Sequence, residues 1–195
     1  MKFQVDSDST ALLIIDMING FVAENAPLEV PEARSIVPNI KKLVEKCRQI
    51  SVPIIYANHS FRPDALDRGL MFDFWPVLAD GCLAQGSEGA DIYSELKPEG
   101  GDIIVRKFRY SAFFNTELDT ILRKLGRDSL IITGTLTEFC CESTARDAFF
   151  RDYKVLFVSD ANATSDQESH RSTLRTISRG FGEVVSTADL LKRFQ

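Results

Sequence analysis

The chain has 195 residues, of which 44% are hydrophobic and 26% are charged, and its formal net charge at pH 7 is −5. This length fits one globular domain with a substantial core, so we expect residues 1–195 to form a single domain. The mild acidic excess, without any long run of Lys and Arg, argues against a nucleic acid or an anionic membrane as partner.

The beginning of the sequence does not resemble a targeting signal. Asp6 and Asp8 stand where a secretory signal peptide would have its apolar core. The apolar run that follows, residues 11–15, is much shorter than the ~20 residues that a membrane-spanning helix needs. We therefore expect a cytoplasmic protein that has no membrane partner.

Short apolar runs alternate with helical patterns along the chain. In chain order we expect a strand over 11–15, a helix over 36–50, a strand over 53–57, an irregular stretch over 58–101, a strand over 103–105, a helix over 115–125, a strand over 129–133, a helix over 138–151, a strand over 155–158, a helix over 166–178, a strand over 184–185 and a helix over 188–194. Strands that are apolar throughout are buried on both faces, and intervening helices make them parallel. The predicted fold is α/β, three-layered and doubly wound, with a mostly parallel sheet of about six strands and helices on both faces.

In such a fold the ligand binds beyond the carboxyl ends of the strands. The polar groups that follow the expected strands are Asp16, Asn58, His59, Lys107, the segment 134–141 and Asp160. The topology therefore predicts that a carboxylate, an amine and a thiol meet at one edge of the sheet.

Cys140 is the candidate nucleophile among four cysteines, which we expect to be free thiols because the chain has no CxxC pair. It falls in the first turn of the helix expected over 138–151, where unpaired N–H groups and the helix dipole lower a thiol pKa and could bind an oxyanion. The alternative is a small buried apolar residue. Cys141, one position further, is expected to point into the core.

A thiol nucleophile needs a base. His170 lies in a polar helix and is expected at the surface, whereas His59 follows a strand and remains a candidate. Asp16 is the preferred base, and Lys107 would hold the acid and thiol together and neutralise developing charge. We expect Asp16 and Lys107 at strand ends outside the packed core. The alternatives are a turn cap for Asp16 and a solvated surface charge for Lys107.

These residues carry a family resemblance. Asp16, Lys107 and the segment GTLTEFCCESTARD at 134–147 resemble the isochorismatase-like cysteine hydrolases, whose motif is roughly G-[V/I/T]-x-T-x-x-C-V-x-x-T-A-x-D. The resemblance extends from residue 10 to residue 191. It is most specific in the cysteine block and in KFRYSAFFNT at 107–116, which look most like the ureidoacrylate amidohydrolases of the family.

The resemblance implies an Asp16–Lys107–Cys140 triad. It also implies a cis peptide at Leu136–Thr137, with the backbone N–H groups of Thr137 and Cys140 as the oxyanion hole. It implies no cofactor and no metal, because 58–63 lacks the D-x-H pattern of the metal-binding nicotinamidases. The presence of Cys140 argues against vinyl-ether hydrolysis, because isochorismatases proper lack this cysteine. Family members usually assemble, so we expect a homo-oligomer with a small-molecule substrate.

The predicted activity is cysteine-dependent hydrolysis of a C–N bond in a small amide, ureide or carbamoyl compound, with a covalent thioester intermediate and release of ammonia. The side chains expected to bind the substrate are Phe21, Asn58, His59, Arg62, Tyr110, Phe114, Leu136 and Phe139. Arg62 or Arg109 could bind a substrate carboxylate, or both could be solvated loop charges. The alternatives are an amidase for a larger amide or lactam, and an inactive binding or redox-sensing module.

Overall fold

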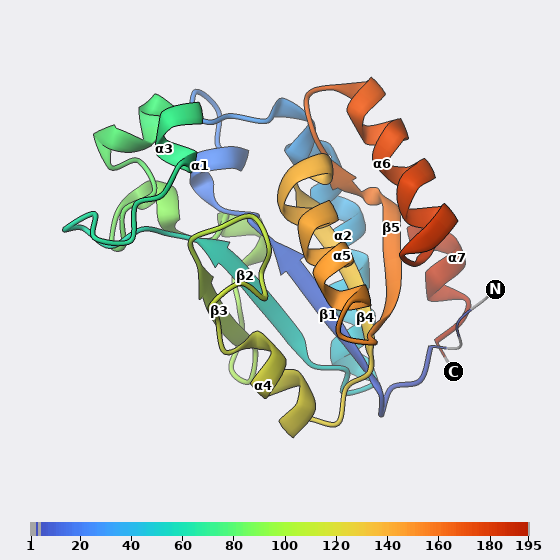
Figure 1. Cartoon of the computed structure of the whole chain (residues 1–195). Coiled ribbons are helices and arrows are strands. Elements are labelled where there is room, and N and C mark those ends of the chain that lie inside the picture. The colour runs from blue at the N-terminus through green and yellow to red at the C-terminus, as the bar shows by residue number, and fades with distance from the viewer. Residues whose placement is uncertain (1–2, 4, 195) are drawn as a thin grey trace.

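A single parallel sheet organises the chain in the computed structural model, which describes residue 3 and residues 5–194 (Figure 1). The six strands lie in the order β3-β2-β1-β4-β5-β6, and every neighbouring pair is parallel. The strands are β1 (Thr10–Ile15), β2 (Ile54–His59), β3 (Ile103–Lys107), β4 (Ser129–Thr135), β5 (Lys154–Ala163) and β6 (Glu183–Val185). This order confirms the predicted doubly wound α/β fold.

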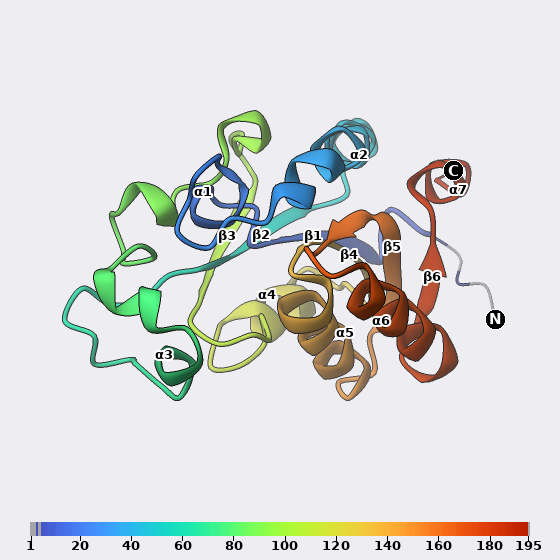
Figure 2. The same cartoon turned by 90° about the horizontal axis from the view of Figure 1, so that it is seen from above.

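Helices cover both faces of the sheet. They are α1 (Asn19–Val22), α2 (Pro31–Gln49), α3 (Met71–Phe74), α4 (Leu118–Lys124), α5 (Glu142–Phe149), α6 (Gln167–Gly180) and α7 (Thr187–Leu191). Figure 2 shows α2 and α7 on one face and α4, α5 and α6 on the other, which gives the three expected layers. Within the described residues, no helix combines the length and the apolar character needed to cross a bilayer.

The central strands are buried because their side chains enter both layers. Every residue of β1 and β4 is buried. Leu12 and Ile14 pack into the core under α2, whereas Leu13 and Ile15 pack into the core under α5. Successive side chains of a strand point to opposite faces, so an uninterrupted apolar run such as TALLII suits only a sheet covered on both sides.

Several element boundaries differ from the sequence prediction. Helix α2 begins at Pro31, five residues before the predicted start at 36, because a proline fits the first helical turn without losing a hydrogen bond. Strand β5 continues to Ala163 past a register shift in its pairing with β4. Asp160 therefore lies within β5, where its carboxylate accepts a hydrogen bond from the Thr187 N–H at 2.7 Å and holds the start of α7.

The expected irregular stretch and the expected helix over 138–151 also have more structure than predicted. Residues 60–102 contain α3 and the short 3-10 turns Pro76–Asp80, Glu88–Ala90 and Ser94–Leu96. A single π-helical turn, Thr137–Cys141, precedes α5, which begins at Glu142. In Figure 1, α1 and α3 lie beyond the carboxyl ends of β1 and β2, so this extra structure surrounds the edge where the ligand site is expected.

Gly134 allows β4 to approach β1 closely at the edge that carries the site. Its φ angle is +124°, and a Cβ atom at this position would lie 2.0 Å from the Ile15 carbonyl oxygen. Both the backbone conformation and the available space exclude a larger residue here. Gly134 therefore sets how closely the Cys140 segment approaches the end of β1.

We predict that Gly134→Ala lowers the free energy of unfolding by about 2–4 kcal/mol, because alanine is strained at this φ and collides with β1. Urea unfolding followed by circular dichroism measures the change. Gly100→Ala is the matched control, since nothing lies within 4 Å of a Cβ atom built at Gly100. Equal unfolding midpoints for the two variants would contradict the close approach of β4 to β1.

Candidate active site

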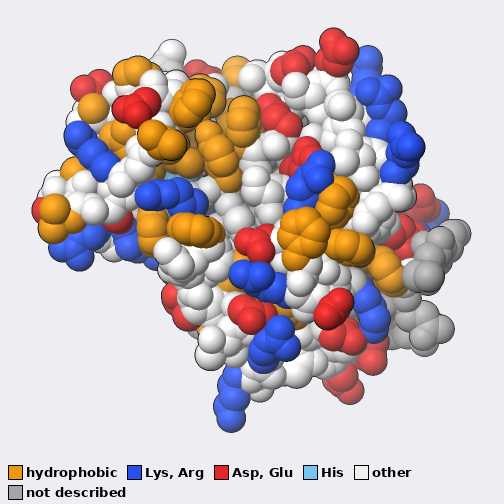
Figure 3. Space-filling model, in the orientation of Figure 1, with side chains coloured by type: hydrophobic (Ala, Val, Ile, Leu, Met, Phe, Trp, Pro, Cys, Tyr) orange, Lys and Arg blue, Asp and Glu red, His pale blue; other side chains and the backbone are white. Residues whose placement is uncertain are grey.

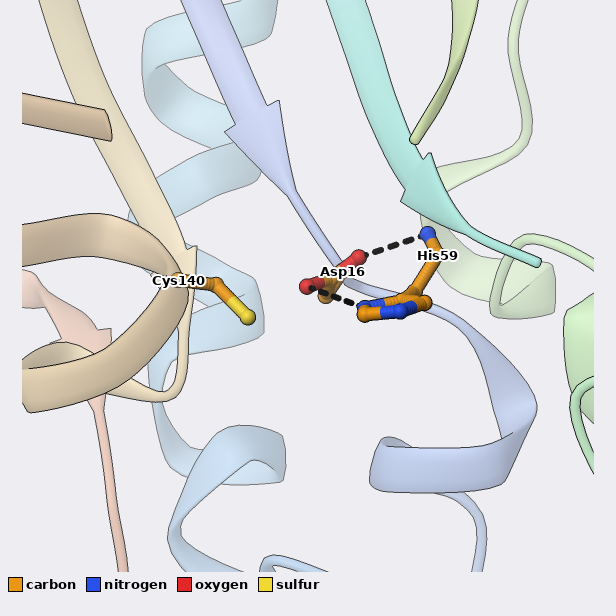
Figure 4. A group of neighbouring side chains, drawn as sticks. All are labelled: Asp16, His59 and Cys140. Atoms are coloured by element: carbon orange, nitrogen blue, oxygen red, sulfur yellow. Dashed lines mark hydrogen bonds and ion pairs between the residues drawn. The ribbon is translucent and has the colours of Figure 1, made fainter. Parts of the chain in front are cut away.

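Asp16 follows β1 directly and has an unusual backbone conformation, with a φ angle of +52°. Its backbone N–H donates to the Ala57 carbonyl at 3.1 Å, which holds this conformation against the end of β2. The side chain is completely buried. One carboxylate oxygen, Oδ1, accepts a hydrogen bond from the His59 backbone N–H at 2.7 Å (Figure 4). Strained backbone of this kind is found preferentially at functional sites.

Lys107 ends β3 and reaches Asp16 across the intervening strand. Its Nζ lies 2.6 Å from Asp16 Oδ2 and donates to the Arg109 carbonyl at 3.2 Å. Burial lowers the pKa of Lys107, but the neighbouring Asp16 carboxylate, together with the contact to Cys140, raises it by more, so the pKa lies above its usual value and the amine is charged. The strand order β3-β2-β1 explains why Lys107 lies close to Asp16. Lys107 of β3 is the register partner of His59 in β2, and Asp16 follows β1, the next strand of the sheet.

The expectation that Asp16 and Lys107 lie outside the packed core is wrong. Both side chains have no exposed surface. The reason is that α1 and the segment 60–102 cover the carboxyl ends of the strands, which a strand-end argument from sequence treats as open to solvent.

Cys140 completes the group from the other side of Asp16. It lies in the π-helical turn after β4 and is 3% exposed. Figure 4 shows its sulfur directed toward Asp16, opposite His59. The sulfur, a carboxylate oxygen of Asp16 and a ring nitrogen of His59 all lie within 4.8 Å of one another. The Thr144 hydroxyl donates to the Cys140 carbonyl at 2.7 Å and fixes this turn to α5.

The protonation state of Cys140 differs from the sequence prediction. Burial raises the pKa of the thiol, the nearby Asp16 carboxylate raises it further, and Lys107 partly opposes both effects. The prediction of a lowered pKa considered only the helix start and omitted burial and the neighbouring carboxylate. The resting thiol is therefore neutral, and Asp16 is the adjacent group that can accept its proton.

The four cysteines have free thiols, as expected. Cys141 is completely buried, and burial raises the pKa of its thiol well above the usual value. Unlike Cys140, it does not reach the cavity described next. This placement agrees with the expectation that Cys141 packs in the core.

A cavity of about 290 Å³ opens next to Cys140. The residues expected to bind substrate that line it are Phe21, His59, Tyr110, Leu136 and Phe139. The remaining wall comes from residues of the segments 27–30 and 71–83 and from Ser165, which the sequence analysis missed. The apolar run LMFDFWPVLA at 70–79, interrupted only by Asp73, was the available signal.

Three residues expected to bind substrate are not on the cavity wall. Asn58 is adjacent to His59 in β2, so its side chain points to the other face of the sheet. The exposed Arg62 side chain pairs with Asp64, and Phe114 is 47% exposed. Arg109, the other candidate for binding a carboxylate, donates to the Asp67 carbonyl at 3.1 Å and does not line the cavity.

The expected cis peptide and the expected position of His170 also need correction. The cis bond joins Thr135 to Leu136, one peptide earlier than Leu136–Thr137. No residue type marks a non-proline cis bond, so a sequence motif does not fix its register. His170 is half-buried, and its Nδ1 lies 3.0 Å from the Thr137 hydroxyl, because α6 packs against the π-helical turn.

Asp16, His59 and Cys140 together offer an oxygen, a nitrogen and a sulfur, the donor types that bind zinc. However, the Lys107 ammonium already lies 2.6 Å from Asp16 and 3.2 Å from His59 Nδ1. A metal ion bound to these atoms would be in contact with a buried positive charge. The donor set therefore fits an internal ammonium ion better than a metal.

The sequence model of the isochorismatase domain family matches residues 10–189 of this chain. The chain belongs to the isochorismatase family. Two relatives are an isochorismatase of Bacillus subtilis, 37% identical over 97% of this chain and 59% of that protein, and a ureidoacrylate amidohydrolase of Acinetobacter baylyi, 30% identical over 98% of this chain and 86% of that protein. The chain thus spans 59% of the length of the Bacillus isochorismatase.

Among solved structures, a cysteine hydrolase from Pseudomonas syringae pv. phaseolicola superposes with a TM-score of 0.95 and 36% identity, covering 98% of this chain and 95% of that one. The fold and the family predicted from the sequence are therefore confirmed. The roles of individual side chains rest on the geometry described above.

We predict that iodoacetamide alkylates Cys140 before Cys141, because Cys140 lines the cavity and Cys141 does not. Peptide mapping by mass spectrometry, in a Cys82→Ser background that removes the half-exposed thiol, identifies the modified residue. The alkylation rate should still be rising above pH 9, since burial and Asp16 raise the thiol pKa. Asp16→Asn should move this rise to lower pH, because it removes the carboxylate that raises the thiol pKa and leaves Lys107, which lowers it. A rate that is already constant at neutral pH in the wild type would contradict the neutral resting thiol.

Proposed function

We propose that the chain is a cysteine-dependent amidohydrolase that cleaves a C–N bond in a small amide, ureide or carbamoyl compound and releases ammonia. The observation that supports this most is the buried Asp16–Lys107 ion pair in contact with Cys140 at the wall of a cavity. An acid, an amine and a thiol held together in this way are the groups needed to activate a nucleophile. Relatives named ureidoacrylate amidohydrolase and cysteine hydrolase support the same class of reaction.

In the proposed first half-reaction, Asp16 accepts the thiol proton while Cys140 attacks the substrate carbonyl carbon. The backbone N–H groups of Thr137 and Cys140 would stabilise the oxyanion, and Lys107 would stabilise the negative charge that moves between the carboxylate and the sulfur. Asp16 then returns the proton to the leaving nitrogen, and ammonia departs from a primary amide.

In the second half-reaction, water attacks the thioester with Asp16 as base, and Cys140 is released as a thiol. The protons balance, because Asp16 passes one proton from Cys140 to the leaving nitrogen in the first half-reaction and one proton from water to the Cys140 sulfur in the second. This cycle uses a neutral thiol in the resting state, in agreement with the raised pKa of Cys140.

We predict that Asp16→Asn and Lys107→Met each lower turnover at least about a hundredfold, because Asp16 transfers the proton and Lys107 stabilises the negative charge that moves between carboxylate and sulfur. Each should also lower the free energy of unfolding by about 3–5 kcal/mol, since it leaves one buried charge unpaired. The double variant Asp16→Asn/Lys107→Met should recover much of the stability and none of the activity.

Ammonia release and urea unfolding measure the two effects separately. Asp128→Asn is the matched control, because it breaks an exposed ion pair with Lys154 and should leave both quantities near the wild-type values. Full activity in the double variant would show that the pair has a structural role alone, and it would contradict the proposed mechanism.

We predict that activity survives prolonged chelation and dialysis, because Lys107 occupies the place where a metal would bind Asp16 and His59. The measurement is ammonia release before and after treatment with a chelator, with metal content followed by elemental analysis. Activity that disappears and returns on addition of zinc would contradict this assignment.

We also propose that the chain forms a homo-oligomer. Figure 3 shows hydrophobic side chains gathered in two areas of one face, near α1 and α3 and near α5. The exposed residues include Leu70, Phe74 and Phe150, which are 75%, 77% and 71% exposed. Large exposed apolar groups of this kind often mark protein–protein contacts. Light scattering at several protein concentrations tests the proposal, and a monomer throughout would refute it.

A further inference from the structure

Much of the cavity wall is apolar and partly aromatic. Phe139 stands edge-on to Trp75, with a centroid distance of 6.2 Å, and packs against Tyr110 at 5.2 Å. The Trp75 Nε1–H donates to the Tyr110 hydroxyl at 3.2 Å, which engages the polar end of the tryptophan within the wall. Rings fixed in this way offer a rigid surface for a flat or apolar ligand.

No cationic side chain stands on this wall among the described residues that line the cavity. Glu29 is the one charged side chain among the described residues of the wall, and it pairs with Arg34 at 2.7 Å. Lys107 is buried behind His59 and is paired with Asp16. A ligand carboxylate placed here would lose its water shell without gaining a counter-charge, which is strongly unfavourable.

His59 presents a defined hydrogen-bond donor to the same cavity. Its Nδ1 lies 3.2 Å from the Lys107 ammonium, which can only donate, so Nδ1 is the acceptor. Burial and then the charge of Lys107 hold the pKa of His59 well below its usual value, and the ring is neutral. A neutral ring with an accepting Nδ1 carries its proton on Nε2.

This Nε2–H group has no hydrogen-bond partner within the described part of the chain, although His59 is only 2% exposed. Buried donors are normally paired, so an unpaired one at a cavity wall indicates a place for a ligand acceptor. The ring also packs against Phe61 in a tilted arrangement, with a centroid distance of 4.8 Å, which restricts its orientation. Position, tautomer and environment together make His59 suited to orient a bound molecule beside Cys140.

We infer that this site selects an uncharged amide with an apolar acyl group, and that His59 Nε2–H donates a hydrogen bond to an acceptor atom of that substrate. The inference rests on the proposed amidohydrolase function and specifies the class of substrate. The ureido acids and other anionic amides considered from the sequence are then poor ligands, because Arg62 and Arg109 are engaged elsewhere.

The first test measures binding without turnover, in the Cys140→Ala variant. Isothermal titration compares benzamide with 4-nitrobenzamide and 4-carbamoylbenzoate, the last two having the same shape but differing by one negative charge. We expect the two neutral amides to bind, and the anion to bind at least about tenfold more weakly because its charge is desolvated without a partner. Equal or tighter binding of 4-carbamoylbenzoate, or no binding of any of the three, overturns the substrate class.

The second test addresses the hydrogen bond from His59. His59→Phe removes the donor and should weaken benzamide binding about tenfold, whereas His59→Gln keeps a side-chain N–H and should recover most of it. When Cys140 is retained, the same two His59 variants should change KM for benzamide more than kcat. Because His59→Phe removes a partner of Lys107 and can affect folding, nitrogen-15 NMR of the His59 ring in the Cys140→Ala variant gives an independent measurement.

Benzamide should shift the His59 Nε2–H signal as the bond forms, and an unchanged signal at saturation overturns the role of His59. Glu29→Gln should strengthen binding of 4-carbamoylbenzoate relative to 4-nitrobenzamide, with Glu45→Gln on the exposed face of α2 as the matched control. If Cys140→Ala shows these preferences but the wild type releases no ammonia, the proposed function fails and the inferred selectivity stands. If the wild type instead releases ammonia efficiently from anionic amides, the proposed function stands and the inferred selectivity is overturned.

Discussion

A carboxylate and an ammonium ion, both removed from water, meet where three neighbouring strands end. Asp16 and Lys107 are 2.6 Å apart and completely buried. Burying two charges is costly unless each is well paired and hydrogen-bonded. Here Asp16 also accepts the His59 backbone N–H, and Lys107 donates to the Arg109 carbonyl, so the surrounding backbone completes the pair.

The pair determines the state of the two groups beside it. The Asp16 carboxylate, added to burial, keeps Cys140 protonated. The Lys107 ammonium fixes the tautomer of His59 and keeps the ring neutral. In the proposed mechanism the thiol loses its proton only to Asp16, which would protect it from unwanted alkylation and oxidation, since both require the thiolate. The same arrangement directs a hydrogen-bond donor, His59 Nε2–H, toward the place where a substrate would lie.

The segments that lie over the carboxyl ends of the strands exclude solvent from the Asp16–Lys107 pair. Helix α1, the segment containing α3 and the aromatic residues Trp75, Tyr110 and Phe139 enclose the cavity with mostly apolar side chains. Such walls strengthen electrostatic interactions inside the site and at the same time disfavour a charged substrate that brings no counter-ion. The features that would support the proposed chemistry of Cys140 would therefore also limit which amides can enter.

The sequence by itself determined the fold class and the residues at the centre of the site. Continuous apolar strands separated by helices require a parallel sheet covered on both faces, and Asp16, His59, Lys107 and Cys140 each lie at or just after the end of such a strand. The tertiary structure alone decided the burial of Asp16 and Lys107, the raised pKa of Cys140, the cis bond at Thr135–Leu136 and the removal of Arg62 and Phe114 from the cavity. These properties depend on contacts between segments far apart in the sequence, such as the cover that residues 60–102 form over the strand ends, and not on any local periodicity.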